Sequence, residues 1–571
     1  MRKGLFLLLL SAVSVCAQET ALYNDLHFEL DPIHKTAAVS SNPFIMGEIL
    51  IPETIVVGQD TYVVNEIGDK AFKGAKKLTA IVIPSCVERV YRSAFDGTGI
   101  IADKTMWNEG ALIIDSILIA TNKSIKPHYV IPENVRLMAC GAFENNKAVT
   151  RVEIPETIDK IDHFMFYGCR NLEKVTIPTS VTWIGQDVLT GSGIYNNDKK
   201  WRKGGLMVDG CLIAVQKDCS AKYDFKSKVP ARLIAAGAFY GNKTISRLII
   251  PDGISEIADA TFYQCENLQE VVIPQSVTKV GKLAFAECGK LKKATLPKTV
   301  TEIGARCFYN CVNLQEQTLN EQIKGIPTAC FFACRGLKSI DLPAQVEIIS
   351  SGAFAGCANL EKIVLPNSIR KIGEQAFAGC IKFEQVVLPE QLNEVSKGTF
   401  QDCRMLYKVT LPEGLYAIGD EAFMNCLNLE RINVPSTTFR IGEKAFMDCQ
   451  HLERIALADH IHSIEANAFA NCKILIELEL PEELELMGEG AFFHCINLRK
   501  LEFSHKLEKI PAHAFQECKA LEEVTIENPI EEIGDEAFMD CVRLKKVNYK
   551  TEIEVMGKNV FKNTKVANSG L

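Results

Sequence analysis

The sequence is short of the features that mark membrane proteins and most enzymes. Beyond residue 17, no stretch approaches the roughly 20 apolar residues that a membrane helix needs. There is no Gly-x-Ser-x-Gly, no glycine-rich phosphate loop and no paired carboxylate outside a repeating pattern. We therefore expect no transmembrane segment, no enzyme activity and no cofactor.

Positive charge is slightly outnumbered, with 63 Lys and Arg against 71 Asp and Glu. The formal net charge is -8, and loss of the first 17 residues would also remove Arg2 and Lys3, which lowers the charge by two to -10. An acidic surface of this kind repels nucleic acid and anionic lipid headgroups. Neither is an expected partner of the chain as a whole.

The first residues have the pattern of an export signal. Two basic residues precede an apolar run over residues 5–15, and Val15 and Ala17 stand at the two positions that a signal peptidase reads. This predicts a signal peptide at 1–17. A lipid anchor through Cys16 is an alternative, although Val15 is a poor residue before a lipidated Cys. In both cases the protein is exported, to the cell surface or to the medium.

One motif recurs along almost the whole chain. From residue 239 a Phe returns every 23 residues, and the same spacing holds in two shorter stretches upstream. The 20 anchors are Phe72, Phe95, Phe143, Phe166, Leu189, Phe239, Phe262, Phe285, Phe308, Phe331, Phe354, Phe377, Phe400, Phe423, Phe446, Phe469, Phe492, Phe515, Phe538 and Phe561. So strict a spacing predicts that the anchors stack on one another in a solenoid.

A single repeat is clearest over residues 353–376. Residues 360–365 alternate as in a strand buried on one side, and Pro366 ends that strand. A second short extended piece follows, and residues 376–380 predict a short helical turn. Because 23 residues close only one coil, the apolar side chains are buried only when coils stack.

The fold class expected is a β-rich α/β right-handed solenoid of about 20 coils, one for each anchor, with parallel strands and short helical turns. The side chains that we expect to build its core include Phe239, Phe262, Phe285, Phe354, Phe377, Cys357 and Cys380.

Two breaks in the period share one design. The anchors on either side of them are 48 and 50 residues apart, where two coils would take 46. Each break contains a Trp, at Trp107 and Trp201, followed by two apolar runs around Asp-Ser or Asp-Gly, which predicts a β-hairpin. We expect two hairpins, near 100–125 and 194–225, that project from the same side of the solenoid.

The remaining parts are short. Residues 18–65 lack the anchor, and two apolar runs in them predict a capping hairpin that covers the open edge of the first coil. The repeat array then spans 66–565, and 566–571 form a tail.

The repeat resembles a known family. Its consensus, Leu-x-x-Ile-x-Leu-Pro-x-x-Ile-x-x-Ile-Gly-x-x-Ala-Phe-x-x-Cys, is similar to the 23-residue leucine-rich repeat of the BspA-like family over residues 66–565. The resemblance implies a leucine-rich-repeat solenoid in a bacterial cell-surface or secreted protein. It also implies an adhesin-like role, toward a host matrix protein or another microbe, without naming the partner.

Cysteine is frequent, with 21 in the chain. Fourteen stand three residues after an anchor, so stacked coils would hold them ~4.8 Å apart, a separation that a disulfide can bridge. An unbroken column selects no partners, however, and buried Cys behaves as a small hydrophobe, which favours thiols. The pairs at 307, 311 and 330, 334 could offer four zinc ligands. Two of these four fill a slot that elsewhere holds Ala, so we expect no metal.

Two kinds of residue are candidates for binding. The strand position that points away from the core is apolar in the middle of the array, at Ile249, Val272, Val364 and Val387. β-Branched residues also suit strand surfaces without any partner. Trp107 and Trp201 are the second candidates because Trp is enriched at binding hot spots, although they could instead pack the hairpins onto the array.

These features together predict a non-enzymatic, adhesin-like binding protein for an extracellular protein or glycan. We expect it to act as a monomer. The alternative is a periplasmic or envelope scaffold that organises other proteins of the cell.

Overall fold

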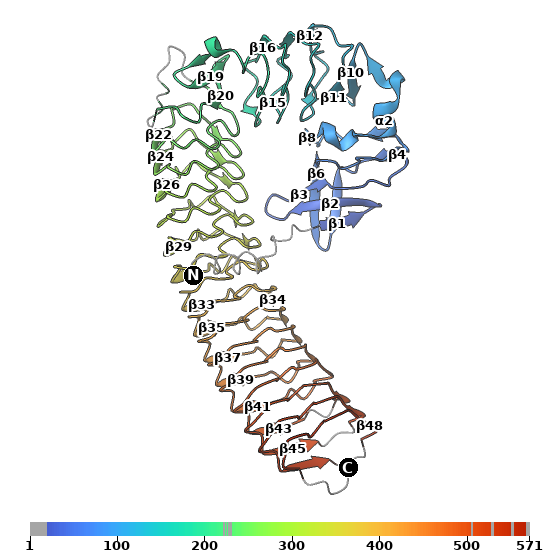
Figure 1. Cartoon of the computed structure of the whole chain (residues 1–571), viewed down its shortest axis with the longest axis vertical. Coiled ribbons are helices and arrows are strands. Elements are labelled where there is room, and N and C mark those ends of the chain that lie inside the picture. The colour runs from blue at the N-terminus through green and yellow to red at the C-terminus, as the bar shows by residue number, and fades with distance from the viewer. Residues whose placement is uncertain are drawn as a thin grey trace. The chain divides into compact units, whose positions relative to one another are not determined.

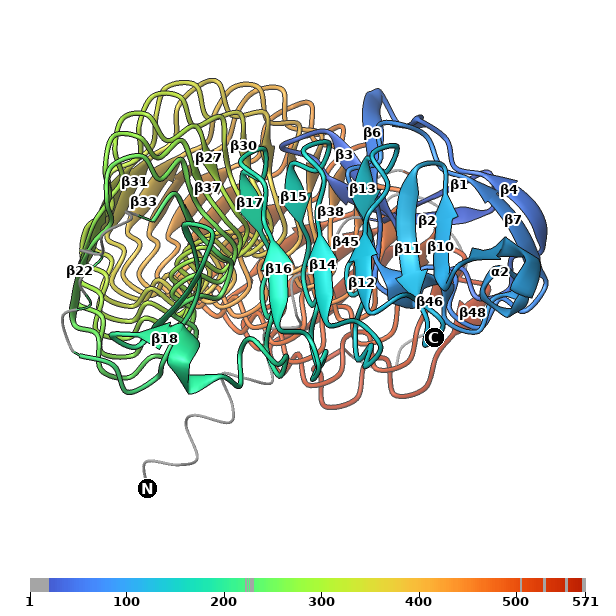
Figure 2. The same cartoon turned by 90° about the horizontal axis from the view of Figure 1, so that it is seen from above.

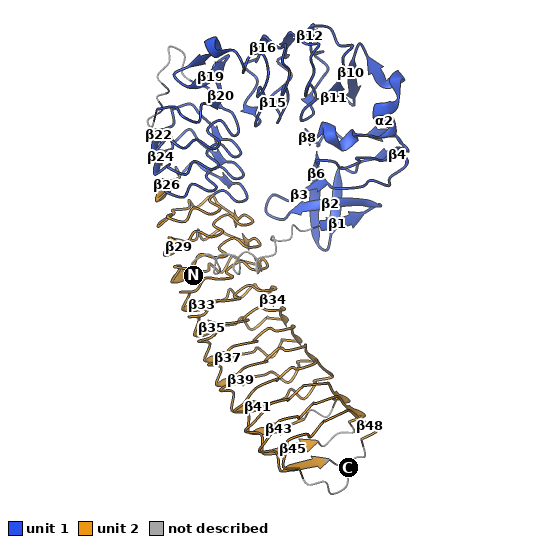
Figure 3. Ribbon diagram, viewed as in Figure 1, with its two compact units in different colours: residues 1–290, 297–307 blue, residues 291–296, 308–571 orange. Residues whose placement is uncertain are grey.

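The computed structural model describes residues 20–220, 223, 225, 231–503, 506–526, 530–549 and 553–566. The expected signal peptide at 1–17, with Cys16, lies outside the described residues, and so does most of the tail at 566–571. The chain divides into two compact units, shown in Figure 3. Unit 1 comprises residues 1–290 and 297–307, and unit 2 comprises residues 291–296 and 308–571.

Unit 1 begins with a mainly antiparallel sheet that forms the cap. Its strands are β1 (Thr20–Tyr23), β2 (Leu26–Asp31), β3 (Thr36–Val39), β5 (Thr54–Val57) and β6 (Asp60–Ile67), in the order β1-β2-β3-β6-β5. Every second side chain of β2 is buried, because its apolar residues alternate with polar ones. A separate pair of strands, β4 (Gly47–Leu50) and β7 (Leu78–Val82), runs parallel and starts the coils.

Each regular coil contributes one strand to each of two columns. The first column is made of strands of mostly three residues and is called the long-strand column. In unit 1 it contains β12 (His128–Val130), β14 (Arg151–Glu153), β16 (Lys174–Thr176), β22 (Arg247–Ile249) and β24 (Glu270–Val272). In unit 2 it contains β26 (Lys293–Thr295), β29 (Ser339–Asp341), β31 (Lys362–Val364), β33 (Gln385–Val387), β35 (Lys408–Thr410), β37 (Arg431–Asn433), β39 (Arg454–Ala456), β41 (Glu477–Glu479), β43 (Lys500–Glu502), β45 (Glu523–Ile526) and β47 (Lys546–Tyr549).

The second, short-strand column is made of two-residue strands. In unit 1 it contains β8 (Arg89–Val90), β13 (Leu137–Met138), β15 (Lys160–Ile161), β17 (Trp183–Ile184), β21 (Leu233–Ile234), β23 (Glu256–Ile257), β25 (Lys279–Val280) and β27 (Glu302–Ile303). In unit 2 it contains β28 (Gly325–Ile326), β30 (Ile348–Ile349), β32 (Lys371–Ile372), β34 (Glu394–Val395), β36 (Ala417–Ile418), β38 (Arg440–Ile441), β40 (Ser463–Ile464), β42 (Leu486–Met487), β44 (Lys509–Ile510), β46 (Glu532–Ile533) and β48 (Val555–Met556).

Strands within a column pair in parallel and in register, so residues 23 apart lie side by side. In β29 and β31, for example, Asp341 lies opposite Val364. The middle residue of each long strand is buried and its two neighbours are exposed in most coils, as the alternating sequence predicts. Figure 2 shows β12, β14 and β16 side by side, with β13, β15 and β17 in the other column. The predicted β-rich repeat solenoid is confirmed.

The anchor side chains occupy the same buried position in each coil. Every anchor from Phe72 to Phe538 is buried, and in unit 2 their rings stack in parallel. The rings of Phe354 and Phe377 are 5.4 Å apart at an interplanar angle of 4°. Stacking at the rung spacing of the sheet explains why the period tolerates no insertion inside a coil.

The anchor segment forms tight turns where a short helical turn was expected. The N–H of Phe377 donates to the carbonyl of Thr399 in the next coil at 3.0 Å, so this donor is not used within a helix. Gln375 and Gly379 have positive φ angles of 54° and 70°. Helix is confined, among the described residues, to α2 (Gly99–Ala102) and the 3₁₀ turns η1 (Arg92–Phe95), η2 (Lys104–Met106) and η3 (Asp198–Lys200).

The column of cysteines has a hydrogen-bonding role. The thiol of Cys357 donates to the carbonyl of Phe331, the anchor one coil before, at 3.1 Å, and the same bond recurs along the column. No disulfide joins any of the 20 cysteines in the described part of the chain. Burial raises the pKa of the Cys265 thiol to about 12, so this group stays protonated and can donate. A small side chain that also satisfies a carbonyl suits this slot better than Ala does.

The two insertions are hairpins, but they do not project. The first has β9 (Trp107–Asn108), β10 (Ala111–Ile114) and β11 (Ile117–Thr121), and the second has β18 (Trp201–Arg202), β19 (Gly205–Val208) and β20 (Cys211–Val215). Leu112, Ile117, Leu118 and Ile119 are all fully buried. The expectation of projecting hairpins is wrong. Their strands consist of consecutive apolar residues, so both faces of each hairpin are apolar and are buried in the protein.

Each hairpin acts as a wedge in unit 1, and its last strand pairs in parallel with the next short strand, β11 with β13 and β20 with β21. Immediately after these short strands the chain returns to the preceding coil, since the N–H of Cys140 donates to the carbonyl of Val90 at 2.7 Å and that of Ala236 to the carbonyl of Ile184 at 2.8 Å. The long-strand column is interrupted at the same places. Extra strands that separate two coils up to the short strand, but not at Cys140 or Ala236, must bend the stack. Unit 1 turns at both hairpins, as Figure 1 shows near β10 and β19.

An Asp and an Arg close the gap beside the first wedge. The carboxylate of Asp115, in the hairpin turn, accepts a hydrogen bond from the N–H of Ile83 at 2.7 Å. In a regular coil this N–H would donate to the neighbouring strand. The guanidinium of Arg136 donates to the carbonyls of Pro84 and Val87 at 3.1 and 2.9 Å. The strand end left without a neighbour is thereby satisfied.

The second wedge is closed in the same way. Asp209 accepts the N–H of Ile177 at 2.9 Å, and Arg232 donates to the carbonyls of Pro178 and Val181 at 2.8 and 2.6 Å. The Asp in the turn of each hairpin and the Arg that follows the hairpin in sequence therefore recur together in both insertions.

Candidate binding surfaces

The outward position of the long strands, ten residues after each anchor, is the outer row. The four residues proposed from the sequence are exposed there, at 59% for Ile249, 39% for Val272, 79% for Val364 and 67% for Val387. Ile249 and Val272 lie opposite each other on β22 and β24 of unit 1. Val364 and Val387 stand on successive coils of unit 2, one repeat apart. Each unit thus has its own pair of exposed apolar side chains.

Sequence reasoning missed earlier members of the outer row. Leu50 and Val82 are exposed and lie opposite each other on β4 and β7, and Val130 is exposed on β12. Val82 could have been found, because it follows Phe72 by ten residues. Leu50 could not, since its coil has no anchor from which to count.

The two hairpin tryptophans pack against the solenoid. The indole N–H of Trp107 donates to the carbonyl of Ile101 at 3.2 Å, and that of Trp201 to Tyr195 at 2.8 Å. Both side chains are half-buried against the core of unit 1. Their polar atom is satisfied inside the protein, which favours the packing role over the binding role.

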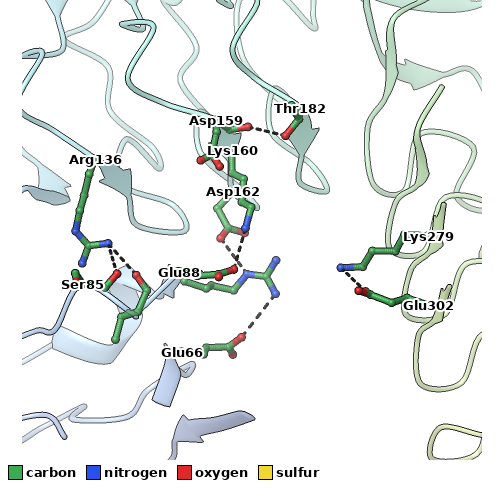
Figure 4. A network of polar contacts seen from close by, with 12 residues as sticks. Glu66, Ser85, Glu88, Arg136, Asp159, Lys160, Asp162, Thr182, Lys279 and Glu302 are labelled. Atoms are coloured by element: carbon green, nitrogen blue, oxygen red, sulfur yellow. Dashed lines mark hydrogen bonds and ion pairs between the residues drawn. The ribbon is translucent and has the colours of Figure 1, made fainter. Parts of the chain in front are cut away.

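The short-strand column of unit 1 carries a buried polar network (Figure 4). Arg89 on β8 bonds to Asp162 at 3.0 Å and faces Glu66 at 3.6 Å. Its guanidinium lies 5.2 Å from the centre of the Trp183 ring. Burial raises the pKa of Glu66, against the opposing effect of Arg89. Burial also lowers the pKa of His163, so its ring is neutral near pH 7, and its Nδ1 accepts the N–H of Gln186.

This network closes the inner side of the first bend. Arg89 and Asp162 are 73 residues apart and belong to coils on opposite sides of the wedge. Asp162 and Tyr91 stand in the slot four residues before the anchor, which elsewhere often holds Gly, and that departure was the signal in the sequence. Paired charges around an Arg–Trp contact hold elements together.

A row of stacked aromatic rings on unit 2 was also missed. Tyr416, Phe439 and His462 stand 16 residues after successive anchors, and their rings stack at 5.4 and 4.3 Å. Tyr416 and Phe439 are exposed. Counting the repeat at this slot would have found the row, here called the aromatic ladder. Stacking stabilises adjacent rungs by itself, so a partner is not needed to explain it.

Metal and membrane sites were sought across the described residues. No group of three or more His, Cys, Asp or Glu in that part of the chain is placed to hold a metal ion, and the four cysteines at 307, 311, 330 and 334 are buried. No helix in the described ranges combines the length and the hydrophobicity that crossing a bilayer requires.

Comparison with known proteins gives a family and a fold. A family model described as a BspA type leucine rich repeat region matches residues 60–126, 120–197, 232–342, 324–453 and 440–567. No curated protein matches the chain. Among solved structures, the chain is similar to a leucine-rich repeat protein from Bacteroides ovatus at 21% identity and TM-score 0.42, covering 92% of this chain and 94% of that one.

Two further solved structures are similar over smaller parts. A leucine rich cell surface protein from Faecalibacterium prausnitzii is 23% identical with TM-score 0.33, covering 77% of this chain and 95% of that one. A leucine-rich repeat protein of T. pallidum is 25% identical with TM-score 0.30, covering 33% of this chain and 90% of that one.

Proposed function

This chain belongs to the BspA-type leucine-rich repeat family, and from that premise we propose that it is a non-enzymatic binding protein, displayed on the cell surface or secreted. It binds an extracellular protein or glycan in the manner of an adhesin and acts as a monomer. Export rests on the basic and apolar pattern of residues 1–17.

One observation carries the proposal: apolar side chains stand exposed on successive rungs of a rigid strand column. Val364 and Val387 contribute nothing to the core at 79% and 67% exposure. Lys362 and Gln385 occupy the first position of the same two strands and are exposed. An apolar strip with a polar border is the usual composition of a protein-binding patch.

Binding of the exported chain to an array of matrix proteins and glycans tests this proposal. For any ligand found, Val364→Ser with Val387→Ser is expected to reduce binding at least tenfold, since each buried apolar side chain contributes about 1.5 to 3 kcal/mol. The matched control is Asn433→Ala with Thr525→Ala, which changes the same slot in coils that do not neighbour those of Val364 and Val387. Equal loss in both variants would contradict the assignment.

Localisation needs its own test. Protease treatment of intact cells should degrade a surface protein and leave an envelope scaffold untouched. If the protein survives and stable envelope partners copurify with it, the scaffold alternative replaces the adhesin-like role.

A further inference from the structure

The cap presents an apolar loop that takes no part in the core. Phe44 is 90% exposed and Met46 is 61% exposed. Ile45 between them packs against the core of unit 1. Phe44 and Met46, on either side of Ile45, are both directed outward. The tip of residues 43–46 therefore offers an aromatic and an aliphatic side chain to the surroundings.

The loop is held firmly at both ends. The N–H of Asn42 donates to the carbonyl of Ala71 at 2.6 Å, and its buried side chain accepts the N–H of His27 at 2.9 Å. The N–H of Gly47 donates to the carbonyl of Lys77 at 2.8 Å. These bonds fix the loop beside residues 71–77 of the next coil. Its exposure is built into the fold and does not come from fraying.

The turn beside the loop is basic. Residues 69–77 contain four lysines and one aspartate, and Lys70 pairs with Asp69 at 3.2 Å. Lys73, Lys76 and Lys77 are exposed, and none of them forms an ion pair within the ranges that the structure describes. Glu48 borders the loop on its other side. A local excess of positive charge thus lies on one side of the loop in a chain that is acidic overall.

We propose that residues 43–46 together with Lys73, Lys76 and Lys77, the cap patch, dock the protein onto an anionic lipid surface. Phe44 and Met46 enter the boundary between headgroups and acyl chains, while the lysines attract the phosphate groups. A soluble polyanion would need the lysines alone and would leave both apolar side chains in water. The acidic remainder does not oppose docking, because charges beyond about 8 Å are screened at physiological salt.

This role concerns how the protein is held at a surface and is independent of the ligand proposed above. The test is flotation of the chain without residues 1–17, whose apolar run would itself enter lipid, with vesicles of phosphatidylcholine alone or mixed with phosphatidylglycerol. Binding is expected only to the mixed vesicles. Replacing Lys73, Lys76 and Lys77 by Gln should weaken it roughly 100-fold, taking each Lys as about fivefold.

The controls separate charge from position. Lys338→Gln, Lys397→Gln and Lys408→Gln remove the same charge from unit 2 and should leave binding unchanged. Phe44→Ser with Met46→Ser should weaken binding at least tenfold, whereas Val364→Ser with Val387→Ser should not. Far-ultraviolet circular dichroism of each variant checks that it folds.

Three results would overturn the proposal. The first is absence of binding to phosphatidylglycerol vesicles. The second is equal loss in the Lys variants of the cap and of unit 2. The third is binding to heparin that depends on the lysines and ignores Phe44 and Met46, which would assign the patch to anionic polysaccharides.

Discussion

Removing the side chain of Arg136 should open unit 1 at its first bend. Arg136→Ala takes away the donors for the carbonyls of Pro84 and Val87, at 3.1 and 2.9 Å. A hydrogen bond from a charged donor contributes about 1.5 to 3 kcal/mol, and water can replace part of it at this half-buried position. We therefore expect a local loss of about 2 to 4 kcal/mol.

Hydrogen exchange measured on peptides is the suitable assay, because the coils of a repeat array need not unfold together. Amides of residues 83–91 and 107–121 should exchange roughly 30- to 1,000-fold faster, since each 1.4 kcal/mol is a factor of ten. Peptides over 231–249, beyond the second wedge, should keep their rates. Arg232→Ala should give the reverse pattern.

Arg247→Ala provides the matched control. Arg247 is exposed and its ion pair with Glu270, at 3.1 Å, lies at the surface. Such a pair contributes about 1 kcal/mol or less. If Arg136→Ala and Arg247→Ala change exchange to the same extent, or if Arg136→Ala loosens the whole chain evenly, the closing role of Arg136 is wrong.

Three further predictions follow from burial and charge. Phe354→Ala should destabilise unit 2 by about 3 to 5 kcal/mol in urea unfolding, whereas the exposed Val364→Ser should change it by less than about 0.5 kcal/mol. Maleimide at pH 8 should label Cys86, the one half-buried thiol among the described cysteines, before any other, and the rest only in denaturant; early labelling of the column would contradict its protonated, buried state. Burial raises the pKa of Glu256 to about 7 from 4.5, so the folded state favours the protonated carboxyl. Stability should then fall as pH rises from 4.5 to 7, and Glu256→Gln should relieve this loss by roughly 1 to 3 kcal/mol at pH 8 and by nothing at pH 4; a gain of equal size at both pH values would refute the assignment.

The repeat could be predicted in detail because residues at the same position of each coil have the same burial and the same neighbours. A Phe every 23 residues sets the register, and the outer row follows by counting ten residues further, as Val364 shows. The segment after the anchor was expected to be helical because Phe and Cys are spaced as on a helix face. Its N–H groups bond instead to the next coil, which is a tertiary preference that local spacing does not contain.

The parts that escaped prediction lie where the repeat is interrupted. The Asp-Ser turn correctly suggested a hairpin, but its direction depends on Arg136 and Asp115 meeting the previous coil, 32 to 52 residues away in sequence. The cap patch combines a loop without an anchor and a turn of the following coil. The sequence of neither segment alone predicts a binding surface. The hydrogen bonds of Asn42 and Gly47 to the following coil bring the two segments together.

The wedges explain why a protein built from one repeat carries several distinct surfaces. A regular stack repeats the same slots at a constant spacing, so its rows can differ only in side-chain type. A hairpin separates neighbouring coils at the long strand and at the short strand, and the coils meet again at Cys140 and Ala236, so the stack bends there. The coils on either side of the first wedge then meet on the inner side of the bend, where Arg89 reaches Asp162 across 73 residues. The charges of the Arg89 network are bonded within the protein, whereas the outer row, the aromatic ladder and the cap patch are exposed. Binding is therefore expected on the outer row and the cap, and substitutions in the Arg89 network should alter stability without altering ligand or lipid specificity.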